Sequence, residues 1–473
     1  MADYWGNQEL NGAVTTVSTY SAATSHNTEG IFFRGLYDYD DKYFANASYR
    51  RDASSRFHPD HRWGNFFSFG AAWMMTKESW MKNAKWLNTL KLKASFGQQG
   101  NDNIGDFRYV DTYNINNLNG EVALTFNSKG SEKITWETCS SLNVGVEFDM
   151  FNGRFGGGIE YYNKKTTDML LFVSDPLTSG YTGHYENVGD MSNNGVEVEL
   201  RAIPVKTRDF SWGLNLNLTH NVNKVTYLSV ENKGSNASYY NDGKVYQGAQ
   251  SGNYFIGEGL PRHTWYLRHY LGVNDKGQAL YACANAADCS GTTTVWSNAD
   301  YVLCGSPYSD VNGGFGTSIS YKGIALNVGF TYAIGGKVFD DGYRTSMTMP
   351  SMGYTGGALH QDVLNAWSAT NTTSSIPRLQ FNDLNSNYTS SRWLTDGSYL
   401  SLQSVNLSYT FPQKLVRAIC LSNLRVYVSG ENLYLWSKRK GLDPRSNSGF
   451  DGYCAITNYV PMRTLTAGIS LNF

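Results

Sequence analysis

Few residues in this chain have the types and spacing of a catalytic site. Glu197 and Glu199 form a carboxylate pair two residues apart, and paired carboxylates are what glycosidases use as acid and base. Residues at i and i+2 lie on the same face of a strand, and Arg201 continues that face. We therefore interpret the pair as charge that faces an aqueous interior, rather than as a catalytic dyad.

The histidines and the other acidic clusters give no stronger indication of chemistry. The histidines are scattered, and no HExxH, GxSxG or GxxxxGK[ST] motif is present. Asp102, Asn103 and Asp106 are spaced loosely like the ligands of a calcium loop, but the glutamate that ends such a loop is absent. We expect no enzyme, no metal site and no cofactor.

Aromatic residues gather instead in one long polar segment, 221–311, which is rich in Tyr, Asn, Ser and Gly. Aromatic rings pack on the apolar faces of sugars, and Asn, Asp and Arg hydrogen-bond to sugar hydroxyls. Loops of this composition are also generic recognition surfaces, and any single Tyr can equally belong to a loop core. The candidate substrate-binding residues are Tyr239, Tyr240, Trp265, Tyr266 and Tyr270.

Six cysteines are present, and none lies in a CxxC pair, which disfavours metal binding. An oxidising compartment allows disulfides to form. We predict a disulfide between Cys283 and Cys289, which lie close together in one segment, and an alternative second pair between Cys304 and Cys454. Cys420 is expected to be unpaired.

The elements that carry these residues are indicated by the end of the chain. Leu465, Ala467, Ile469, Leu471 and Phe473 alternate with small polar residues, which is the pattern of a strand whose two faces meet different solvents. The final aromatic, Phe473, is typical of a membrane barrel, where aromatics lie at the bilayer boundary. We predict that these residues form a C-terminal strand used in barrel assembly.

The same alternation recurs along the chain in runs of roughly 9–11 residues, the length that a tilted strand needs to cross a membrane. Including the last strand, the predicted strands lie near 30–37, 42–51, 64–74, 89–98, 139–149, 153–163, 194–202, 209–220, 312–321, 323–333, 397–411, 423–433 and 463–473. Residues 9–20 are a further candidate. The total of about 14 predicts an all-β, antiparallel transmembrane β-barrel.

The connections between these strands alternate between short and long, as in outer-membrane barrels with short periplasmic turns and long extracellular loops. We therefore divide the chain into an upstream strand or loop remnant, 1–29, and a barrel portion, 30–473. The predicted outer loops are about 99–138, 164–193, 221–311, 334–396 and 434–462.

Composition is compatible with this class and excludes others. The chain has 473 residues, of which 17% are charged and 14% aromatic, with 48 glycines and a net charge of −1. This charge balance gives no reason to expect a nucleic-acid partner. No run of about 18 apolar residues exists, which excludes a helical membrane span. No signal peptide is visible at the start, so we expect a portion of a longer protein.

Several stretches resemble the C-terminal barrel of SusC/RagA-type TonB-dependent outer-membrane transporters. They occur in the family's order and cover most of the chain from about residue 30 onward. The resembling stretches are LKLKASFGQQGN (90–101), ITWETCSSLNVGVEF (134–148), YYNKKTTDMLL (161–171), MSNNGVEVEL (191–200), GSPYSDVNGGFGTSISYKG (305–323), IPRLQFNDLNSNYTSSRWLTDGSYLSLQSVNLSYTFP (376–412) and NLRVYVSGENLYLWSKRKGLDP (423–444).

This resemblance implies a 22-stranded barrel in the outer membrane of a Gram-negative cell. It also implies an N-terminal plug, a segment that contacts the TonB complex, and a SusD-like surface lipoprotein that closes over the extracellular loops. Family members import oligosaccharides and, in some cases, peptides. The chain departs from the family because the plug and roughly eight strands are absent from it, so its residues are expected to contribute wall and loops only.

Two alternatives from other classes remain open at this point. A passive porin or barrel-type adhesin would need neither plug nor TonB. A soluble lectin or glycoside hydrolase built from β-sandwiches would place carboxylates in a cleft, but the apolar strand faces and Phe473 argue against it. The function we predict is the barrel part of a TonB-dependent importer of oligosaccharides, with a peptide importer as its alternative.

Overall fold

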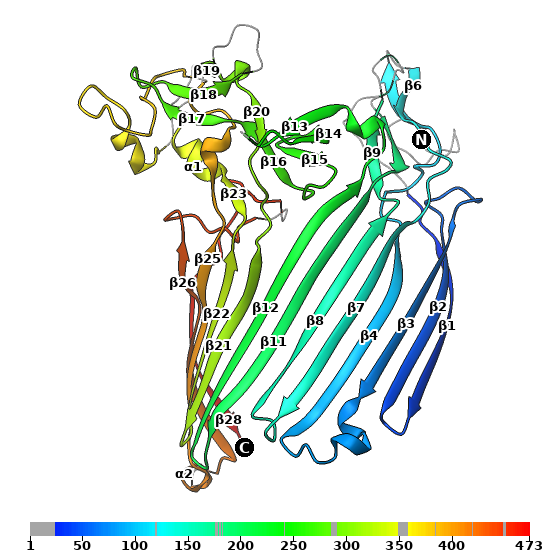
Figure 1. The fold of residues 1–473 in the computed structure, drawn as a ribbon. Coiled ribbons are helices and arrows are strands. Elements are labelled where there is room, and N and C mark those ends of the chain that lie inside the picture. Colours follow the sequence, from blue (N-terminus) through cyan, green and yellow to red (C-terminus); the bar gives the residue numbers. More distant parts are fainter. Residues whose placement is uncertain are drawn as a thin grey trace.

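The computed structural model describes residues 24–473, apart from 119–120, 176–177, 179–180, 182, 241, 285–290, 349–357, 384, 419 and 448–450. One 13-stranded antiparallel sheet dominates it and forms a curved wall (Figure 1). Its strands, in spatial order, are β1 (Thr28–Tyr39), β2 (Tyr43–Ser54), β3 (Trp63–Met74), β4 (Leu87–Asn101), β7 (Glu137–Met150), β8 (Phe155–Thr167), β11 (Asp190–Lys206), β12 (Phe210–Tyr227), β21 (Val311–Tyr321), β22 (Ile324–Ile334), β25 (Tyr399–Thr410), β26 (Asn423–Ser437) and β28 (Thr464–Asn472).

All thirteen strands that the alternation predicts from residue 30 onward are therefore present. Their ends lie within about four residues of the predicted ones, except that β12 extends seven residues further, to Tyr227. Each pairs with its neighbour in the sheet, so the order in space follows the order in the chain. The further candidate at residues 9–20 lies outside the described residues. The fold is the all-β barrel type that the sequence predicts.

The two faces of the sheet differ in chemistry, and the register shows this row by row. One cross-strand row on the face that we call the apolar face runs through Trp73, Leu92, Val146, Ile159, Val198 and Leu218. The neighbouring row, on the opposite polar face, runs through Lys93, Gly145, Glu160, Glu197, Thr219 and Asn312. In a membrane barrel such an apolar face meets lipid and such a polar face lines the lumen.

The apolar face is left open to its surroundings. Val144 is 48% exposed and Ile159 is 43% exposed, although each lies in the middle of a long strand. Soluble proteins rarely expose so continuous an apolar surface. Among the described residues, no helix is long and apolar enough to span a membrane.

The turns at one end of the sheet are short, and the backbone conformation of the β21–β22 turn shows how two residues can connect neighbouring strands. The β21–β22 turn consists of Lys322 and Gly323, which both have positive φ, the conformation that a two-residue hairpin with right-handed strand twist requires. Two turns carry short helical segments, namely 3₁₀ turns at Met75–Lys77 and Ser79–Met81 and α2 at Gln413–Arg417.

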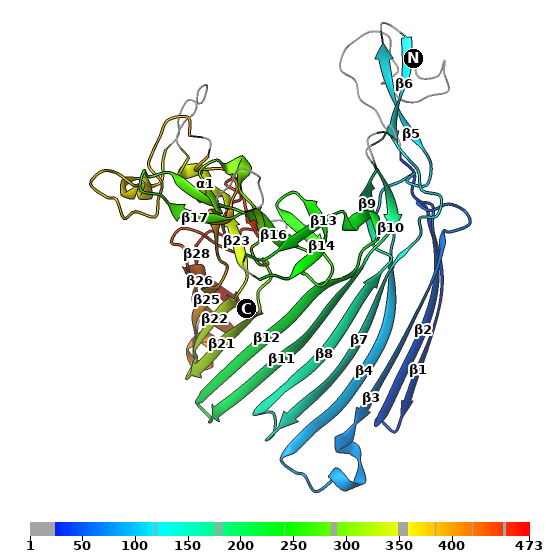
Figure 2. The same cartoon turned by 45° about the horizontal axis from the view of Figure 1, so that its top comes forward.

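The long connections all emerge at the other end of the sheet, where they form small sheets of their own (Figures 1 and 2). These sheets contain β5 (Thr112–Leu118) with β6 (Glu121–Ser128); β9 (Leu170–Ser174) with β10 (Gly183–Asn187); β13 (Ser235–Ser238), β14 (Val245–Ser251), β15 (Tyr254–Gly257), β16 (Thr264–Arg268) and β20 (Tyr301–Leu303); β17 (Tyr270–Val273), β18 (Ala279–Cys283) and β19 (Gly291–Thr293); and β23 (Lys337–Asp340), β24 (Leu394–Asp396) and β27 (Tyr453–Cys454).

The packed hydrophobic cores lie in these connections rather than in the sheet. The largest joins Trp265, Leu267, Phe339, Met347 and Trp393, with the β27 residue Tyr453 packed against it. The indole N–H of Trp265 donates to the carbonyl oxygen of Lys337 at 2.8 Å. Helix α1 (Asp341–Ser346) and the 3₁₀ turns Glu231–Lys233, Trp296–Asn298, Gln361–Asn365 and Ser391–Trp393 belong to the same region. Three long connections are thus held together as one loop assembly.

Two substitutions at adjacent residues of β7 test whether the two faces of the sheet meet different solvents. Val144→Arg on the apolar face is expected to lower the free energy of unfolding by about 2–4 kcal/mol, because a charge there enters hydrocarbon. Asn143→Arg on the polar face is expected to leave it unchanged. Urea titration of the protein folded into lipid vesicles measures both, and equal effects of the two substitutions would contradict the assignment of the faces.

Candidate functional site

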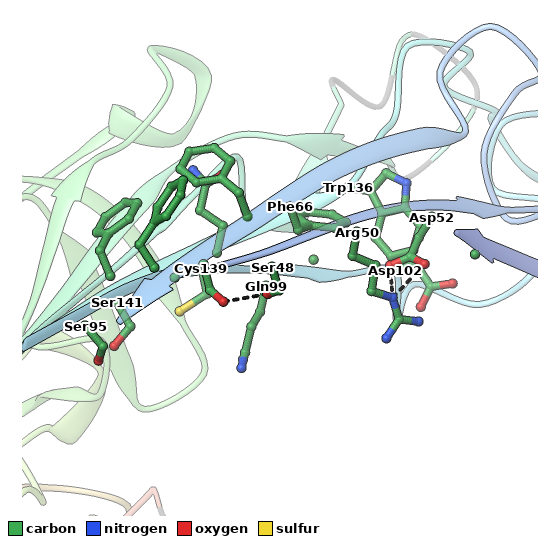
Figure 3. A pocket seen from close by; sticks show the side chains of 18 of the residues that line it. Ser48, Arg50, Asp52, Phe66, Ser95, Gln99, Asp102, Trp136, Cys139 and Ser141 are labelled. Carbon is green, nitrogen blue, oxygen red and sulfur yellow. Dashed lines mark hydrogen bonds and ion pairs between the residues drawn. The ribbon is translucent and has the colours of Figure 1, made fainter. Parts of the chain in front are cut away.

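The first candidate site is a recess of about 1050 Å³ on the polar face, at the loop end of β1 to β8 (Figure 3). Short polar side chains and five charged ones line it. The polar ones include Ser48, Gln99 and Ser141, and the charged ones are Glu29, Arg50, Asp52, Asp102 and Lys164. The strand period places them together, because residues on the same face of neighbouring strands are aligned by the register. Such a lining hydrogen-bonds to hydroxyl or amide groups.

Charged residues at the mouth of this recess are paired with one another. The Nε atom of Arg50 lies 2.6 Å from Oδ2 of Asp52, while much of the arginine side chain stays exposed. Asp102 accepts a hydrogen bond from the Ser54 hydroxyl at 2.6 Å and lies 3.2 Å from Nε2 of His26. The GNDNIGD stretch therefore uses Asp102 to tie the loop to the strands.

Asp106 is used in the same way, since its Oδ1 accepts from Nε of Arg56 at 3.2 Å. Among the described residues, no group of three or more His, Cys, Asp or Glu side chains is arranged to hold a metal ion. The chemistry of this recess is thus hydrogen bonding and charge pairing.

One wall of the recess is aromatic and is fixed by glycines. The Phe66 ring packs edge-on against Trp136, with ring centroids 5.6 Å apart, and only 6% of Phe66 is exposed. A Cβ atom added at Gly100 would meet Cζ of Phe66 at 2.1 Å, and one added at Gly64 would meet it at 2.6 Å. The ring therefore lies over two glycines on neighbouring strands, and no larger residue fits beneath it.

The carboxylate pair of the sequence analysis lies further down the same face. Glu197 stands opposite Glu160 in the register, and both line a second recess of about 610 Å³ with Glu199 and Arg201. The Nζ atom of Lys93 lies 2.7 Å from Glu160 and 3.0 Å from Glu147. The pair is thus part of a charged band across the polar face, as interpreted from the sequence.

The predicted substrate residues separate into different places in the loop assembly. Trp265 has no exposed surface and belongs to the largest core. Tyr239 packs on a smaller core with its ring 6.2 Å from that of Tyr246, and Tyr270 packs against Tyr281 at 5.7 Å. Tyr240 is 48% exposed. The five residues do not form one surface in this structure.

Tyr266 lines the second candidate site, a loop recess of about 520 Å³. Its ring stacks on Tyr301 with centroids 5.0 Å apart, and the Arg268 guanidinium lies 4.0 Å from the Tyr301 ring centroid on β20. Arg268 also donates to the carbonyl oxygen of Ala299, and its buried Nε has no partner among the described residues. The rest of the polar lining consists of Asn236, Ser238, Ser297, Asn298 and Asp300.

The sequence analysis did not select Tyr301, Arg268 or Asn298. The alternation of side chains along β16 could have shown which of its residues share a face. In strand β16 the burial alternates, with Trp265 and Leu267 inside and Tyr266 and Arg268 less buried. Successive side chains of a strand point to opposite faces, so Trp265 and Tyr266 could not both face one ligand. Tyr301 comes to Tyr266 only through the long-range pairing of β16 with β20.

Burial sets the protonation of the groups near the loop recess. It raises the pKa of Tyr266, which keeps the phenol protonated and able to donate a hydrogen bond. It lowers the pKa of His269, whose ring centroid lies 4.1 Å from that of Tyr240, so this imidazole is neutral at pH 7. The recess therefore offers neutral donors and acceptors beside one arginine, Arg268, and one carboxylate, Asp300.

The cysteines agree only partly with prediction. Cys283 is disulfide-bonded, and its predicted partner Cys289 lies outside the described residues. The alternative pair of Cys304 with Cys454 is wrong, because both thiols are free. Burial raises the pKa of Cys304 to about 11 and that of Cys454 to about 12, so both are unreactive thiols inside the loop assembly. Cys139 and Cys420 are also free.

The predicted C-terminal strand is β28, which pairs antiparallel with β26. Leu465 is 72% exposed and Ile469 is 67% exposed, both on the apolar face. Leu471 stands opposite Leu424 in the register. The role of this strand in barrel assembly stays a prediction.

Known protein families and solved structures match this chain over most of its length. Residues 2–340 match the family described as TonB dependent receptor-like, β-barrel. The chain is 31% identical over 466 residues to the TonB-dependent receptor P26 of Formosa agariphila, covering 94% of this chain and 46% of that protein. It is 28% identical over 464 residues to the TonB-dependent receptor SusC of Bacteroides thetaiotaomicron, covering 95% of this chain and 44% of SusC.

Among solved structures, the RagAB peptide transporter is similar, with 27% identity and a TM-score of 0.77 over 95% of this chain and 48% of that one. The RagAB peptide importer in its open-open state gives 26% identity and a TM-score of 0.80. The chain spans about half the length of the relatives that it matches.

The fit of Phe66 over its glycines can be tested by substitution. Gly100→Val is expected to lower the free energy of unfolding by about 1–3 kcal/mol, because the added methyl groups collide with the ring. Phe66→Ala removes the ring, so adding Gly100→Val to that background should cost little. A double-mutant cycle by thermal unfolding measures the coupling, and strict additivity would contradict the packing.

Proposed function

This chain belongs to the TonB-dependent receptor-like β-barrel family as a SusC/RagA-type barrel of the outer membrane, and on that premise we propose that it supplies wall and loops to an importer of oligosaccharides. Import by this route is binding followed by gated passage through the lumen, without covalent chemistry. The polar face lines the path, and the loop assembly makes the first contact with the substrate.

The observation that carries the glycan proposal is the loop recess. It combines the stacked rings of Tyr266 and Tyr301 with Arg268 and short amide and hydroxyl side chains. Rings of this kind pack on the C–H faces of a sugar, while neutral donors and acceptors bind its hydroxyls. The polar-face recess, with Ser48, Gln99 and Ser141, continues the same hydrogen-bonding chemistry toward the lumen.

Two protein partners belong to the proposal. A SusD-like lipoprotein would close over the loop assembly, and the TonB complex would drive opening through the plug of the whole receptor. The connection between β22 and β25 supports the first partner, because it exposes large apolar side chains. These are Leu359, Leu364, Leu379, Phe381 and Tyr388, and Leu364 is 87% exposed. Exposed apolar groups on a loop surface are typical of a protein interface.

Peptide import is the second candidate function. The supporting observation is the likeness to the RagAB peptide transporter, at a TM-score of 0.77. Carbonyl and amide groups of a peptide would use the same serines, asparagines and glutamines. The two functions separate in binding experiments with defined oligosaccharides and defined peptides on one preparation of the protein.

Tyr301→Ala is expected to weaken oligosaccharide binding by about tenfold, because it removes one ring of the stack and the surface against which Arg268 lies. Isothermal titration calorimetry with the full-length receptor measures this change. Tyr459→Ala, an 81% exposed tyrosine outside the recess, is the matched control. Unchanged sugar affinity in the Tyr301 variant would remove the recess from the proposal. Binding of peptides but of no oligosaccharide would favour the second function.

The lid contact has its own test. The double substitution Leu364→Asp with Phe381→Asp is expected to abolish co-purification of the lipoprotein, because it places two charges in an apolar interface. Leu364→Met with Phe381→Leu keeps the surface apolar and should retain the partner. Normal co-purification of the aspartate variant would show that the lid does not rest on this connection.

A further inference from the structure

The apolar face carries one hollow that its regular pattern does not explain. Three alanines, Ala45, Ala71 and Ala94, stand side by side in one cross-strand row on β2, β3 and β4. The same row continues on β7 and β8 with the larger side chains of Val144 and Tyr161. With Gly35 and Ala47 in the next row, these residues leave a hollow of about 570 Å³ that is almost entirely apolar.

Aromatic rings bound this hollow on its sides. Tyr37 on β1 stands next to Ala45 in the register, and Phe69 and Phe96 stand opposite each other toward the loop end. Toward the turn end the next row contains Tyr43 and Trp73, with ring centroids 6.4 Å apart. The hollow is therefore a slot in the lipid-facing wall, closed at the turn end by an aromatic row.

That aromatic row is fixed by a hydrogen-bonded carboxylate. Glu78, in the turn between β3 and β4, accepts from the Tyr43 hydroxyl at 2.6 Å and from the Trp73 indole N–H at 3.2 Å. Trp80 packs edge-on against Trp73 and is 60% exposed, and Trp86 further along the turn is 52% exposed. Exposed tryptophans at the end of a membrane strand lie at the level of the lipid headgroups.

The same turn carries an excess of positive charge directly beyond the aromatics. Lys77 lies 2.9 Å from Asp41, so its charge is already paired. Lys82 and Lys85 are exposed and form no ion pair with any residue that the structure describes. Two free ammonium groups next to interfacial tryptophans are complementary to the phosphate of an anionic lipid.

We propose that this slot and the β3–β4 turn together form a binding site for an anionic phospholipid of the turn-side leaflet. One acyl chain lies in the hollow over Ala45, Ala71 and Ala94. Its phosphate is bound by Lys82 and Lys85 beyond the Tyr43–Trp73 row, which lies two residues, or about 7 Å, further along the strands. The two halves are continuous along one strand direction, so a single lipid molecule can occupy both.

The test measures phosphatidylglycerol bound to the purified full-length receptor in detergent by native mass spectrometry, with phosphatidylcholine as the zwitterionic comparison. Lys82→Ala with Lys85→Ala is expected to weaken phosphatidylglycerol binding by about fivefold for each lysine removed. Ala71→Leu fills the hollow and is expected to weaken it as well. Lys206→Ala with Lys322→Ala is the matched control and should bind normally, because these exposed lysines lie at the end of β11 and in the β21–β22 turn.

Heat-dependent gel mobility checks that each variant is folded. Normal phosphatidylglycerol binding by either the double-lysine variant or Ala71→Leu would overturn the site, and so would equal binding of phosphatidylcholine by the unaltered protein. If Ala71→Leu instead changes the oligomeric mass without changing lipid binding, the hollow is a contact between two barrels and the proposal fails.

Discussion

The structure depends on one constraint, which is that backbone N–H and C=O groups in hydrocarbon must bond to one another because no water is available there. An antiparallel sheet in which every strand pairs with its chain neighbour satisfies this between β1 and β28, on both sides of each of the eleven inner strands. The same sheet separates two solvents, since successive residues alternate between its faces. Among the described residues, the outer sides of β1 and β28 have no partner strand, and closure of a barrel requires one for each.

This constraint explains why the sheet could be predicted from the sequence. A strand between lipid and water must alternate apolar and polar residues. Runs such as Leu214 to Thr219 can therefore be recognised as strands from the local sequence alone, without knowing which strands pair with them. Short turns are indicated by residues that adopt positive φ, as Lys322 and Gly323 do. Boundaries were less accurate because strands extend beyond the membrane into water, where the alternation is no longer required.

The loop assembly could not be predicted for the opposite reason. Its core joins Trp265 to Phe339 and Trp393, residues that are far apart in the chain, and nothing local in the sequence specifies these contacts. Composition drew attention to the tyrosines of the segment, but only the pairing of β16 with β20 brings Tyr301 to Tyr266. The predicted pairing of Cys304 with Cys454 is wrong for a similar reason, because the presence of two cysteines in two outer loops does not place their sulfurs in bonding geometry.

The most direct test of this account is a spin-label scan along β12 in the full-length protein in lipid vesicles. Labels at Leu214, Leu216 and Leu218 are expected to collide mainly with oxygen, which dissolves in the bilayer. Labels at Asn215, Asn217 and Thr219 are expected to collide mainly with a water-soluble nickel complex in the lumen. Such an alternation with a period of two is what the account predicts. Access of the nickel complex to both faces would show that the apolar face does not meet lipid, and would contradict the account.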